Sequence, residues 1–512
     1  MSYQDVDIRV SPSKVDDQQA WVKEVSKKLR REVNVDHIQL IKRSIDARGR
    51  SPKYQLRIRV FDAELIETSK TGLSYPSVTK ELSVLIIGAG PCGYFAALRC
   101  IELGLRPIVL DRGKDVRARR RDLRAIQQFH TVNPDSNYCF GEGGAGTYSD
   151  GKLYTRSVKR GNVRSILETL VHHGAESDIL IDAHPHIGSN KLPHIVSAIR
   201  QSIGEAGGEV HFDKKVIDFL RTKGGFSGVK CGDGTEYQAS ATVLCTGHSA
   251  RDIYQLCMDH DITITFKPFA MGMRLEHPQA LIDEIQYNQR RGDYLPAASY
   301  SLACQVDDHG VFSFCMCPGG LIVPAATSPG ELVVNGMSLS KRNSPFANAA
   351  MVVTVDDNPE PDDVLGGVKY QKNLEQEIFT FGDGSQKAPA QRVTDFLNKN
   401  ISQTLPESSY IPGTYMAPLH QLLPEDITVR IQQALRVFDK RMKGYITEEA
   451  QFVGLESRTS APVRIPRDSD TLMHQDARGL FPAGEGAGYA GGILSAALDG
   501  VRVAEAVHRF YD

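Results

Sequence analysis

The sequence has no excess of either charge and no long apolar run. It contains 60 Lys and Arg against 62 Asp and Glu, a formal net charge of −2, so no overall field attracts nucleic acid or an anionic membrane. An apolar run of about 18 residues, the minimum for a membrane helix, is absent. The first ten residues, MSYQDVDIRV, are acidic and have no apolar core, which argues against a secretory signal and an Arg-rich transit peptide. We therefore expect a cytoplasmic protein that does not bind membranes.

Cysteine is too scattered to organise the fold. The nine cysteines include no pair of C-x2-C motifs, so neither a disulfide framework nor a metal site is expected. Tandem repeats and low-complexity tracts are also absent. What remains is an ordinary composition, 41% hydrophobic and 24% charged, over a length typical of about three domains. This combination favours an enzyme over a small binding module.

Residues 1–78 are expected to form a small, basic α+β domain. A strand at Val6–Val10 precedes a helix at Asp16–Val33, and two apolar-rich runs follow. Between residues 11 and 60 there are 13 Lys and Arg against 6 acidic residues. This excess is typical of a solvated helix face and a charged sheet edge, with nucleic-acid binding as the alternative. The polar segment Thr68–Val78 then marks a domain boundary.

A strand, a glycine turn, a helix and a second strand come next. The strand Leu82–Ile87 leads into Gly88-Ala89-Gly90-Pro91-Cys92-Gly93, which matches G-x-G-x-x-G and opens the helix. The first glycine permits the tight turn and the second lets the backbone approach a pyrophosphate, to which the helix N-terminus offers unpaired N–H donors. Asp111 ends the second strand, where an acid accepts hydrogen bonds from a ribose. The unit predicts a Rossmann-like, ADP-binding domain.

Two later segments indicate FAD as the dinucleotide. Val243-Leu244-Cys245-Thr246-Gly247 resembles the A-T-G loop of two-dinucleotide-type flavoproteins. Gly479-Leu480-Phe481-Pro482-Ala483-Gly484-Glu485-Gly486 resembles their C-terminal motif, whose acid binds the ribityl chain. Ala490-Gly491-Gly492-Ile493 would then begin a helix whose N–H groups point at the flavin O2. Outside this C-terminal motif, no second G-x-G-x-x-G follows a strand, so the sequence shows no separate nicotinamide domain.

The chain as a whole resembles the family of FAD-dependent dehydrogenases described as NAD(FAD)-utilising. The motifs that carry this similarity are Arg43–Arg48, Phe140–Leu153, Phe314–Gly320, Val334–Ser338 and Gly484–Gly492. The resemblance implies non-covalent FAD, with NADH or NADPH as a candidate electron donor. One position departs from this broad class, because the ribose-binding acid is usually Glu and here is Asp111, one methylene shorter.

The expected fold class is α/β: a Rossmann-like FAD-binding domain of glutathione-reductase type, an inserted α+β substrate domain and the small N-terminal α+β domain. The expected boundaries are 1–78 for the N-terminal domain, 79–260 and 452–512 for the two parts of the FAD-binding domain, and 261–451 for the substrate domain. The residues expected to bind FAD are Gly88, Gly90, Pro91, Cys92, Gly93, Asp111, Arg112, Gly143, Gly144, Thr147, Val216, Thr246, Gly247, Gly484, Glu485, Gly491, Gly492 and Ile493.

Few catalytic side chains are needed, because a flavin performs the electron transfer itself. The candidates are Arg274, which could hold an anionic substrate, and His277, which could act as an acid or base near neutral pH. The alternative is an internal ion pair of Arg274 with Glu276 and an unrelated surface His277. Cys315 and Cys317 are expected to pack near the flavin as small hydrophobes, with a redox disulfide as the alternative.

The function expected from these features is an FAD-dependent oxidoreductase that transfers a hydride or two electrons between a small-molecule substrate and the flavin. Two alternatives stay open: an RNA-directed flavoprotein whose N-terminal domain binds the RNA, and a flavin-binding protein without turnover. Aromatic side chains for base stacking are sparse in the basic domain, so nucleic acid is not an expected partner.

Overall fold

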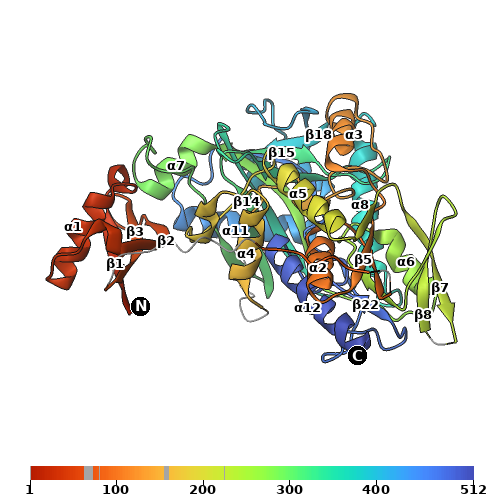
Figure 1. Cartoon of the computed structure of the whole chain (residues 1–512). Helices are drawn as coiled ribbons and strands as arrows, with labels where there is room; N and C mark the ends of the chain where they lie inside the picture. Colours follow the sequence, from red (N-terminus) through yellow and green to blue (C-terminus); the bar gives the residue numbers. More distant parts are fainter. Residues whose placement is uncertain (1, 63–72, 80, 155–160, 224, 512) are drawn as a thin grey trace.

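The computed structural model describes residues 2–62, 73–79, 81–154, 161–223 and 225–511. It is a mixed α/β structure in which the N-terminal domain lies at one end and the C-terminal helix runs along the lower side of the body in the view of Figure 1. The expected α/β class is thereby confirmed. The predicted linker Thr68–Val78 lies partly outside the described residues. Among the described residues, no helix combines the length and apolar character needed to cross a membrane.

The N-terminal domain is a three-stranded antiparallel sheet covered by one helix. Its elements are β1 (Tyr3–Val10), α1 (Gln18–Leu29), β2 (Ile38–Asp46) and β3 (Lys53–Phe61), and the strand order is β1-β3-β2. The helix begins at an Asp17 cap, whose carboxylate accepts a hydrogen bond from the Ala20 N–H. It ends earlier than predicted because Arg30 adopts a left-handed conformation, with φ of 52°.

Most arginines of this domain are paired with carboxylates rather than left as a bare basic patch. Arg57 and Arg59 on β3 bind Asp7 and Asp5 on β1, at 2.8 Å each. Arg43 on β2 reaches the body of the protein, where the backbones of Arg43 and residues 181–183 also exchange two hydrogen bonds. The domain therefore docks through a local strand pairing that an arginine reinforces.

The second unit is a five-stranded sheet whose paired neighbours are all parallel. The strand order is β22-β10-β4-β5-β6, formed by β4 (Ser83–Ile87), β5 (Arg106–Leu110), β6 (Glu209–His211), β10 (Ala241–Leu244) and β22 (Leu480–Pro482). One face packs against α2 (Pro91–Glu102), α4 (Val163–His172), α5 (Leu192–Glu205) and α12 (Ile493–Tyr511). The other face packs against α6 (Arg251–Asp259) and a meander of β7 (Val216–Thr222), β8 (Gly225–Cys231) and β9 (Glu236–Gln238). Strands from both ends of the chain thus build one sheet.

The third unit is a seven-stranded sheet in the order β13-β14-β17-β12-β20-β18-β19. Its strands are β12 (Phe269–Pro278), β13 (Ala303–Val306), β14 (His309–Cys317), β17 (Phe346–Val355), β18 (Ala388–Arg392), β19 (Thr414–Met416) and β20 (Gln451–Glu456). Strand β20 pairs with β12 and β18 inside this sheet. The boundary expected after residue 451 therefore cuts off a strand that belongs to this sheet, and we propose to place it after β20.

Shorter elements complete the body. The helices are α3 (Val116–Phe129), α7 (Gln279–Tyr287), α8 (Gly366–Phe381), α9 (Val393–Asn398), α10 (Leu419–Leu422) and α11 (Glu425–Arg441). Strands β15 (Gly320–Pro324) and β16 (Val334–Ser338) form an antiparallel pair, and β11 (Thr265–Phe266) pairs with β21 (Val463–Arg464). The β11–β21 pair lies where the chain passes between the two large sheets.

Candidate functional site

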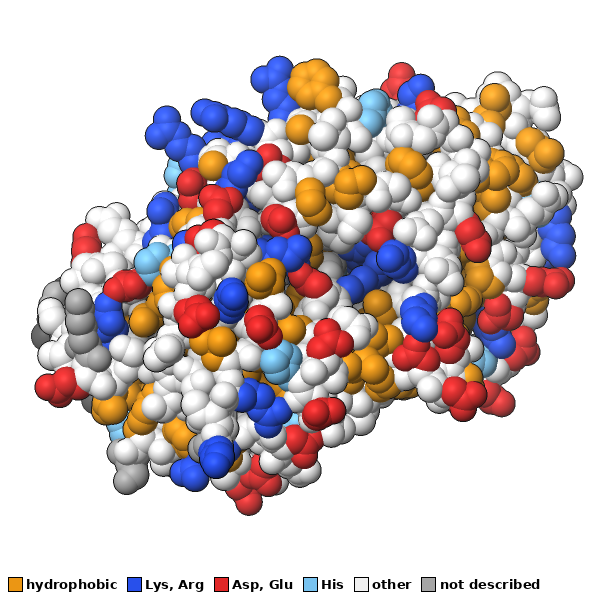
Figure 2. All heavy atoms as spheres, turned by 90° about the vertical axis from the view of Figure 1, so that its right-hand side faces the viewer, with side chains coloured by type: hydrophobic (Ala, Val, Ile, Leu, Met, Phe, Trp, Pro, Cys, Tyr) orange, Lys and Arg blue, Asp and Glu red, His pale blue; other side chains and the backbone are white. Residues whose placement is uncertain are grey.

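A cavity of about 1160 Å³ lies at the carboxyl edge of the parallel sheet and extends to the seven-stranded sheet. This edge is where ligands of parallel α/β sheets bind. Lys and Arg side chains gather beside a hollow near the middle of the face shown in Figure 2. Fourteen of the eighteen predicted FAD-binding residues line the cavity: Gly88, Gly90, Pro91, Cys92, Asp111, Arg112, Gly144, Val216, Thr246, Gly247, Glu485, Gly491, Gly492 and Ile493.

The glycine turn has the geometry that a pyrophosphate site requires. Gly88 has φ of +110°, and a Cβ there would lie 2.7 Å from the Cys245 carbonyl oxygen. A Cβ on Gly93 would lie 1.9 Å from the Gly88 carbonyl oxygen, so this glycine allows the helix to pack against the turn. Gly90 differs, because a Cβ there would meet nothing within 4 Å and would occupy open space beside the cavity. Only the second glycine therefore leaves space that a ligand can use.

Asp111 organises the turn as well as facing the cavity. Its two carboxylate oxygens accept hydrogen bonds from the Ala89 and Gly113 N–H groups, at 2.9 Å each. Each oxygen keeps a second lone pair for a ribose hydroxyl. The shorter side chain is thus matched by a turn that lies close to it. Arg112, expected to bind FAD, is held at the rim by Asp135 and Asp252, at 2.7 and 2.9 Å.

At the middle of the cavity, two polar side chains have unused hydrogen-bonding capacity. The Thr246 hydroxyl is buried without a partner among the described residues, a costly arrangement that a ligand would relieve. Glu485 also lines the cavity, and burial raises the pKa of its carboxyl to about 7 against the opposing effect of Lys267. Gly491 and Gly492 have open space at their Cβ positions. These features fit the polar chain and ring of a flavin.

Four predicted FAD-binding residues do not line the cavity: Gly93, Gly143, Thr147 and Gly484. They support its wall instead. The Thr147 hydroxyl donates to the Glu142 carbonyl at 3.0 Å, and a Cβ on Gly143 would collide with that hydroxyl. The Gly484 N–H donates to Asp499 at 2.8 Å, which positions the neighbouring Glu485.

Sequence reasoning missed Arg119, which organises the loop beside the turn. The run 112–124 is rich in Lys and Arg, a composition typical of a solvated helix face. Arg119 is instead completely buried in α3, where its guanidinium donates to the carbonyl oxygens of Asn137, Tyr138 and Glu142. A basic residue within an otherwise charged helix gives no sequence signal for this role.

The far end of the cavity is lined by charged side chains from separate segments. Lys152 and Arg342 both line it, and both pair with the buried carboxylate of Asp150, at 3.7 and 2.5 Å. Burial opposes ionisation of Asp150, but the two cations lower its pKa to about 2. Arg458 also lines the cavity, held by Glu331 and Glu375 at 2.7 Å each.

Arg274 and His277, the predicted catalytic residues, do not line the cavity. Arg274 is completely buried, and it binds Glu456 at 2.6 Å and the side-chain oxygen of Asn348 at 2.8 Å. His277 is buried on the same strand, where its Nε2 lies 2.8 Å from the Tyr445 carbonyl and burial lowers its pKa to about 4. Neither side chain can touch a substrate here. The reason is the complete burial of β12, which the sequence pattern alone does not reveal.

The ion pair anticipated within this strand is also different from the observed one. Arg274 pairs with Glu456 of β20, and Glu276 instead accepts hydrogen bonds from Ser409. Arg274 also donates to the Cys315 carbonyl at 2.7 Å and lies 3.5 Å from the Cys317 sulfur. It is therefore a positioning residue for the segment that carries Cys315, which lines the cavity.

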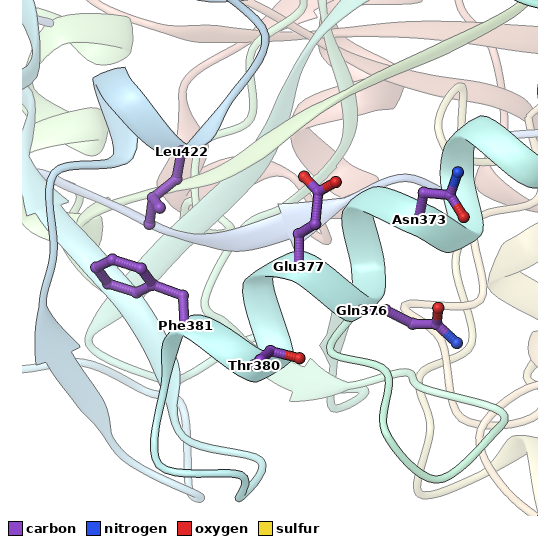
Figure 3. Close-up of a pocket in the computed structure, with 6 residues that line it drawn as sticks. All are labelled: Asn373, Gln376, Glu377, Thr380, Phe381 and Leu422. Atoms are coloured by element: carbon purple, nitrogen blue, oxygen red, sulfur yellow. The ribbon is translucent and has the colours of Figure 1, made fainter.

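A second pocket, of about 570 Å³, is a shallow depression on the outer surface of α8. Figure 3 shows side chains of α8 and Leu422 of α10 around it. Its lining residues are Asn373, Gln376, Glu377, Thr380, Phe381 and Leu422. A single carboxylate and no convergent polar groups make it a poor site for chemistry. Within the described residues, no group of His, Cys, Asp and Glu could hold a metal ion.

Sequence comparisons match two parts of the chain to known families. Residues 268–459 match the family described as FAD-dependent protein, C-terminal domain-like. Residues 2–61 match a domain of unknown function, DUF8436. An uncharacterised protein of Clostridium beijerinckii is 38% identical over an alignment of 524 positions, gaps included, that covers 97% of each chain.

Solved structures with a partial likeness are distant. Glycine oxidase from Geobacillus kaustophilus has a TM-score of 0.35 and 12% identity, covering 83% of this chain and 94% of its own. CtdE in complex with FAD has a TM-score of 0.33 and 12% identity, with 83% and 84% covered. TM-scores this low do not establish a common fold.

Proposed function

We propose that this protein is an FAD-dependent oxidoreductase. The chain belongs to the same family as the clostridial protein, and residues 268–459 match the family described as FAD-dependent protein, C-terminal domain-like. The protein would pass a hydride or two electrons between a small-molecule substrate and non-covalently bound FAD. The observation that carries the proposal is a single cavity that joins a glycine turn at a helix N-terminus to a charged far end. The parallel sheet with a meander on one face supports a glutathione-reductase-type arrangement of the FAD-binding domain.

The residues proposed to hold FAD follow the length of the cavity. The turn at Gly88–Gly93 and the N-terminus of α2 would bind the pyrophosphate through backbone N–H groups. Asp111 would accept hydrogen bonds from the ribose, and Glu485 from the ribityl hydroxyls. The N-terminus of α12 would face the flavin ring, where its N–H groups stabilise negative charge.

Bound FAD would supply the two-electron chemistry. The chain's own contribution is to position the substrate, exclude water and set the local charge. The Arg274–Glu456 pair of the seven-stranded sheet and the Asp150–Arg342 pair of two loops lie at the far side of the cavity, and such preorganised charges act strongly where water is excluded. NADH or NADPH remains the candidate electron donor.

The proposal is tested by the flavin content of the purified protein. We expect a yellow protein whose released cofactor is FAD and not FMN, because the turn and Asp111 are suited to the ADP half. Anaerobic bleaching with NADH and with NADPH, followed by reoxidation with candidate acceptors, would then identify the electron donor. A colourless protein that does not bind added FAD would contradict the proposal.

We propose that the N-terminal domain is a docking module and not a nucleic-acid reader. Its arginines are already engaged by carboxylates, so few are free for phosphates. Binding to tRNA is expected to be weak and to disappear by about 200 mM salt. Tight binding to one RNA at that salt would favour the RNA-directed alternative.

A further inference from the structure

Two cysteines share one lysine at the far end of the cavity. The Lys152 ammonium lies 3.8 Å from the Cys315 sulfur and 3.9 Å from the Cys317 sulfur. Cys315 and Lys152 line the cavity, whereas Cys317 is completely buried behind them. This arrangement differs from the apolar packing expected from the sequence, because an ammonium group beside two sulfurs favours a thiolate.

The backbone is bent to present Cys315 in this position. The pairing of β14 with β17 shifts register between Phe314 and Cys317, which marks a bulge. Cys315 has φ of +45°, a left-handed conformation that is uncommon for a side chain other than glycine. Arg274 donates to the Cys315 carbonyl at 2.7 Å and so holds the bulge. Strained residues held by their surroundings are typical of functional sites.

Among the described residues, the charged side chains around the cysteines carry an excess of one positive charge. Three cations, Lys152, Arg274 and Arg342, face two carboxylates, Asp150 and Glu456. Burial raises the pKa of Glu456 to about 7 against the opposing effect of Arg274, so this residue supplies at most one negative charge. His186 adds no positive charge near neutral pH, since burial and Arg342 lower its pKa. Glu485 also acts on Cys315, and Lys267 opposes the charge of that carboxyl, whose pKa burial raises to about 7.

A thiolate at Cys315 would restore the balance. The hydrogen bond from Cys317 lowers the pKa of the Cys315 thiol well below its usual range, with Lys152 and Arg274 acting in the same direction against burial. Cys317 stays a thiol, because its hydrogen bond to Cys315 and its burial raise its pKa. These directions favour ionisation at Cys315, the sulfur that lines the cavity beside Lys152.

We propose that Cys315 is an ionised thiol that forms a mixed disulfide with small anionic disulfides entering the cavity. The Cys315 sulfur attacks one sulfur of the disulfide, and a new S–S bond forms as the old one breaks. The second sulfur leaves with the electron pair as a thiolate and takes a proton from water. Cys315 is oxidised to a disulfide while half of the ligand is reduced. The exchange requires no flavin, so it is independent of the proposed FAD chemistry.

The preference for an anionic ligand follows from the same charge count. When Cys315 becomes part of a neutral S–S bond, the cluster loses its thiolate and again holds an unpaired positive charge. Lys152 and Arg342 both face the cavity at this point. A carboxylate on the ligand would offset that charge, whereas an ammonium group would add to it.

The experiment compares three small disulfides on the purified full-length protein as isolated, with its bound flavin. The probes are 3,3′-dithiodipropionate (anionic), 2-hydroxyethyl disulfide (neutral) and cystamine (cationic), and peptide mass spectrometry locates the adduct at pH 7. We expect modification at Cys315, at least about tenfold faster than at Cys304, a half-buried thiol on β13 whose pKa burial raises. The rates should fall in the order anionic, neutral, cationic. Equal rates at both cysteines, or a reversed order, would overturn the proposal.

Variants at Lys152 separate charge from packing. Lys152→Met should slow the exchange at Cys315 by about tenfold and abolish the charge preference, and Lys152→Arg should restore both. The thiolate absorbance near 240 nm provides a second measurement, which does not require the Lys152 variants to fold. The wild-type protein should lose it on acidification and Cys315→Ser should lack it. An absorbance unchanged by Cys315→Ser, or a thiolate that no probe modifies, would refute the assignment.

Discussion

The two ends of the cavity are built in different ways. The dinucleotide end is formed by short continuous segments, whose backbone groups contribute more to the site than their side chains do. These segments are the glycine turn, the loop after β10 and the start of α12. The far end is formed by side chains, such as those of Lys152, Arg342 and Arg458, from segments far apart in the chain. The first kind of site can be read from a local motif, while the second exists only after the sheets have assembled.

The two ends also differ in the number of charged side chains that they contain. The turn offers N–H donors and almost no formal charge, which suits an anionic cofactor. The far end encloses several ion pairs with a positive excess. Buried charges of this kind cost desolvation energy unless each has a partner. Removing one charge at the far end should therefore have a larger effect on stability than any single change at the turn.

The largest expected effect comes from Arg274→Met. This change leaves the buried Glu456 carboxylate without its partner and should lower the free energy of unfolding by about 3–5 kcal/mol. Thermal unfolding would measure the loss. The double variant Arg274→Met with Glu456→Met removes both charges and should recover most of it. If the double variant is as unstable as the single one, lost packing and not charge explains the effect.

At the dinucleotide end, Gly90→Val should abolish FAD retention without unfolding the protein. The side chain would enter the open space beside the turn, and we expect affinity to fall at least about 100-fold, or ~2.7 kcal/mol. The matched control is Gly204→Val on the exposed side of α5, where a Cβ also meets nothing within 4 Å. Full FAD content in the Gly90 variant, measured against this control, would refute the assignment of the turn.

Most of the dinucleotide end could be predicted because its signals are local. The strand before the turn, the turn itself and Asp111 are continuous in sequence, and their spacing is set by one strand-helix-strand unit. Even the departure to Asp111 has a physical reason, since its carboxylate binds the turn's own N–H groups. The residues that line the cavity and those that only support its wall could not be separated, because glycines serve in both roles.

The far end could not be predicted for the opposite reason. Arg274 and His277 were singled out because charged residues on a strand suggest chemistry, but both faces of β12 are covered. Lys152 was noticed only as part of a glycine-rich motif, and its contact with Cys315 joins residues 163 positions apart. The place of β20 in the seven-stranded sheet depends on pairings with β12 and β18 that no local pattern encodes.

The pH dependence of stability tests Glu485, which lies between the two ends of the cavity. Burial raises its pKa to about 7, so its carboxyl favours folding when protonated and this contribution is lost as the pH rises from about 4.5 to 7. In FAD-free protein, Glu485→Gln should therefore gain stability over the wild type as the pH rises through this range.

The variant Glu485→Ala should bind FAD more weakly, with a loss of about 1–3 kcal/mol in the free energy of binding. Unchanged FAD affinity would show that this residue does not bind the ribityl chain.

The smallest expected effect concerns Arg43, which joins the N-terminal domain to the loop before His184 and Pro185, two residues that line the cavity. Arg43 binds Asp182 at 2.7 Å and is partly exposed, so Arg43→Gln should cost only about 1 kcal/mol. Hydrogen exchange in residues 181–186 should then accelerate about fivefold. Arg57→Gln is the matched control, because its pair with Asp7 lies within the domain. Equal acceleration in both variants would mean that the docking contact does not hold this loop.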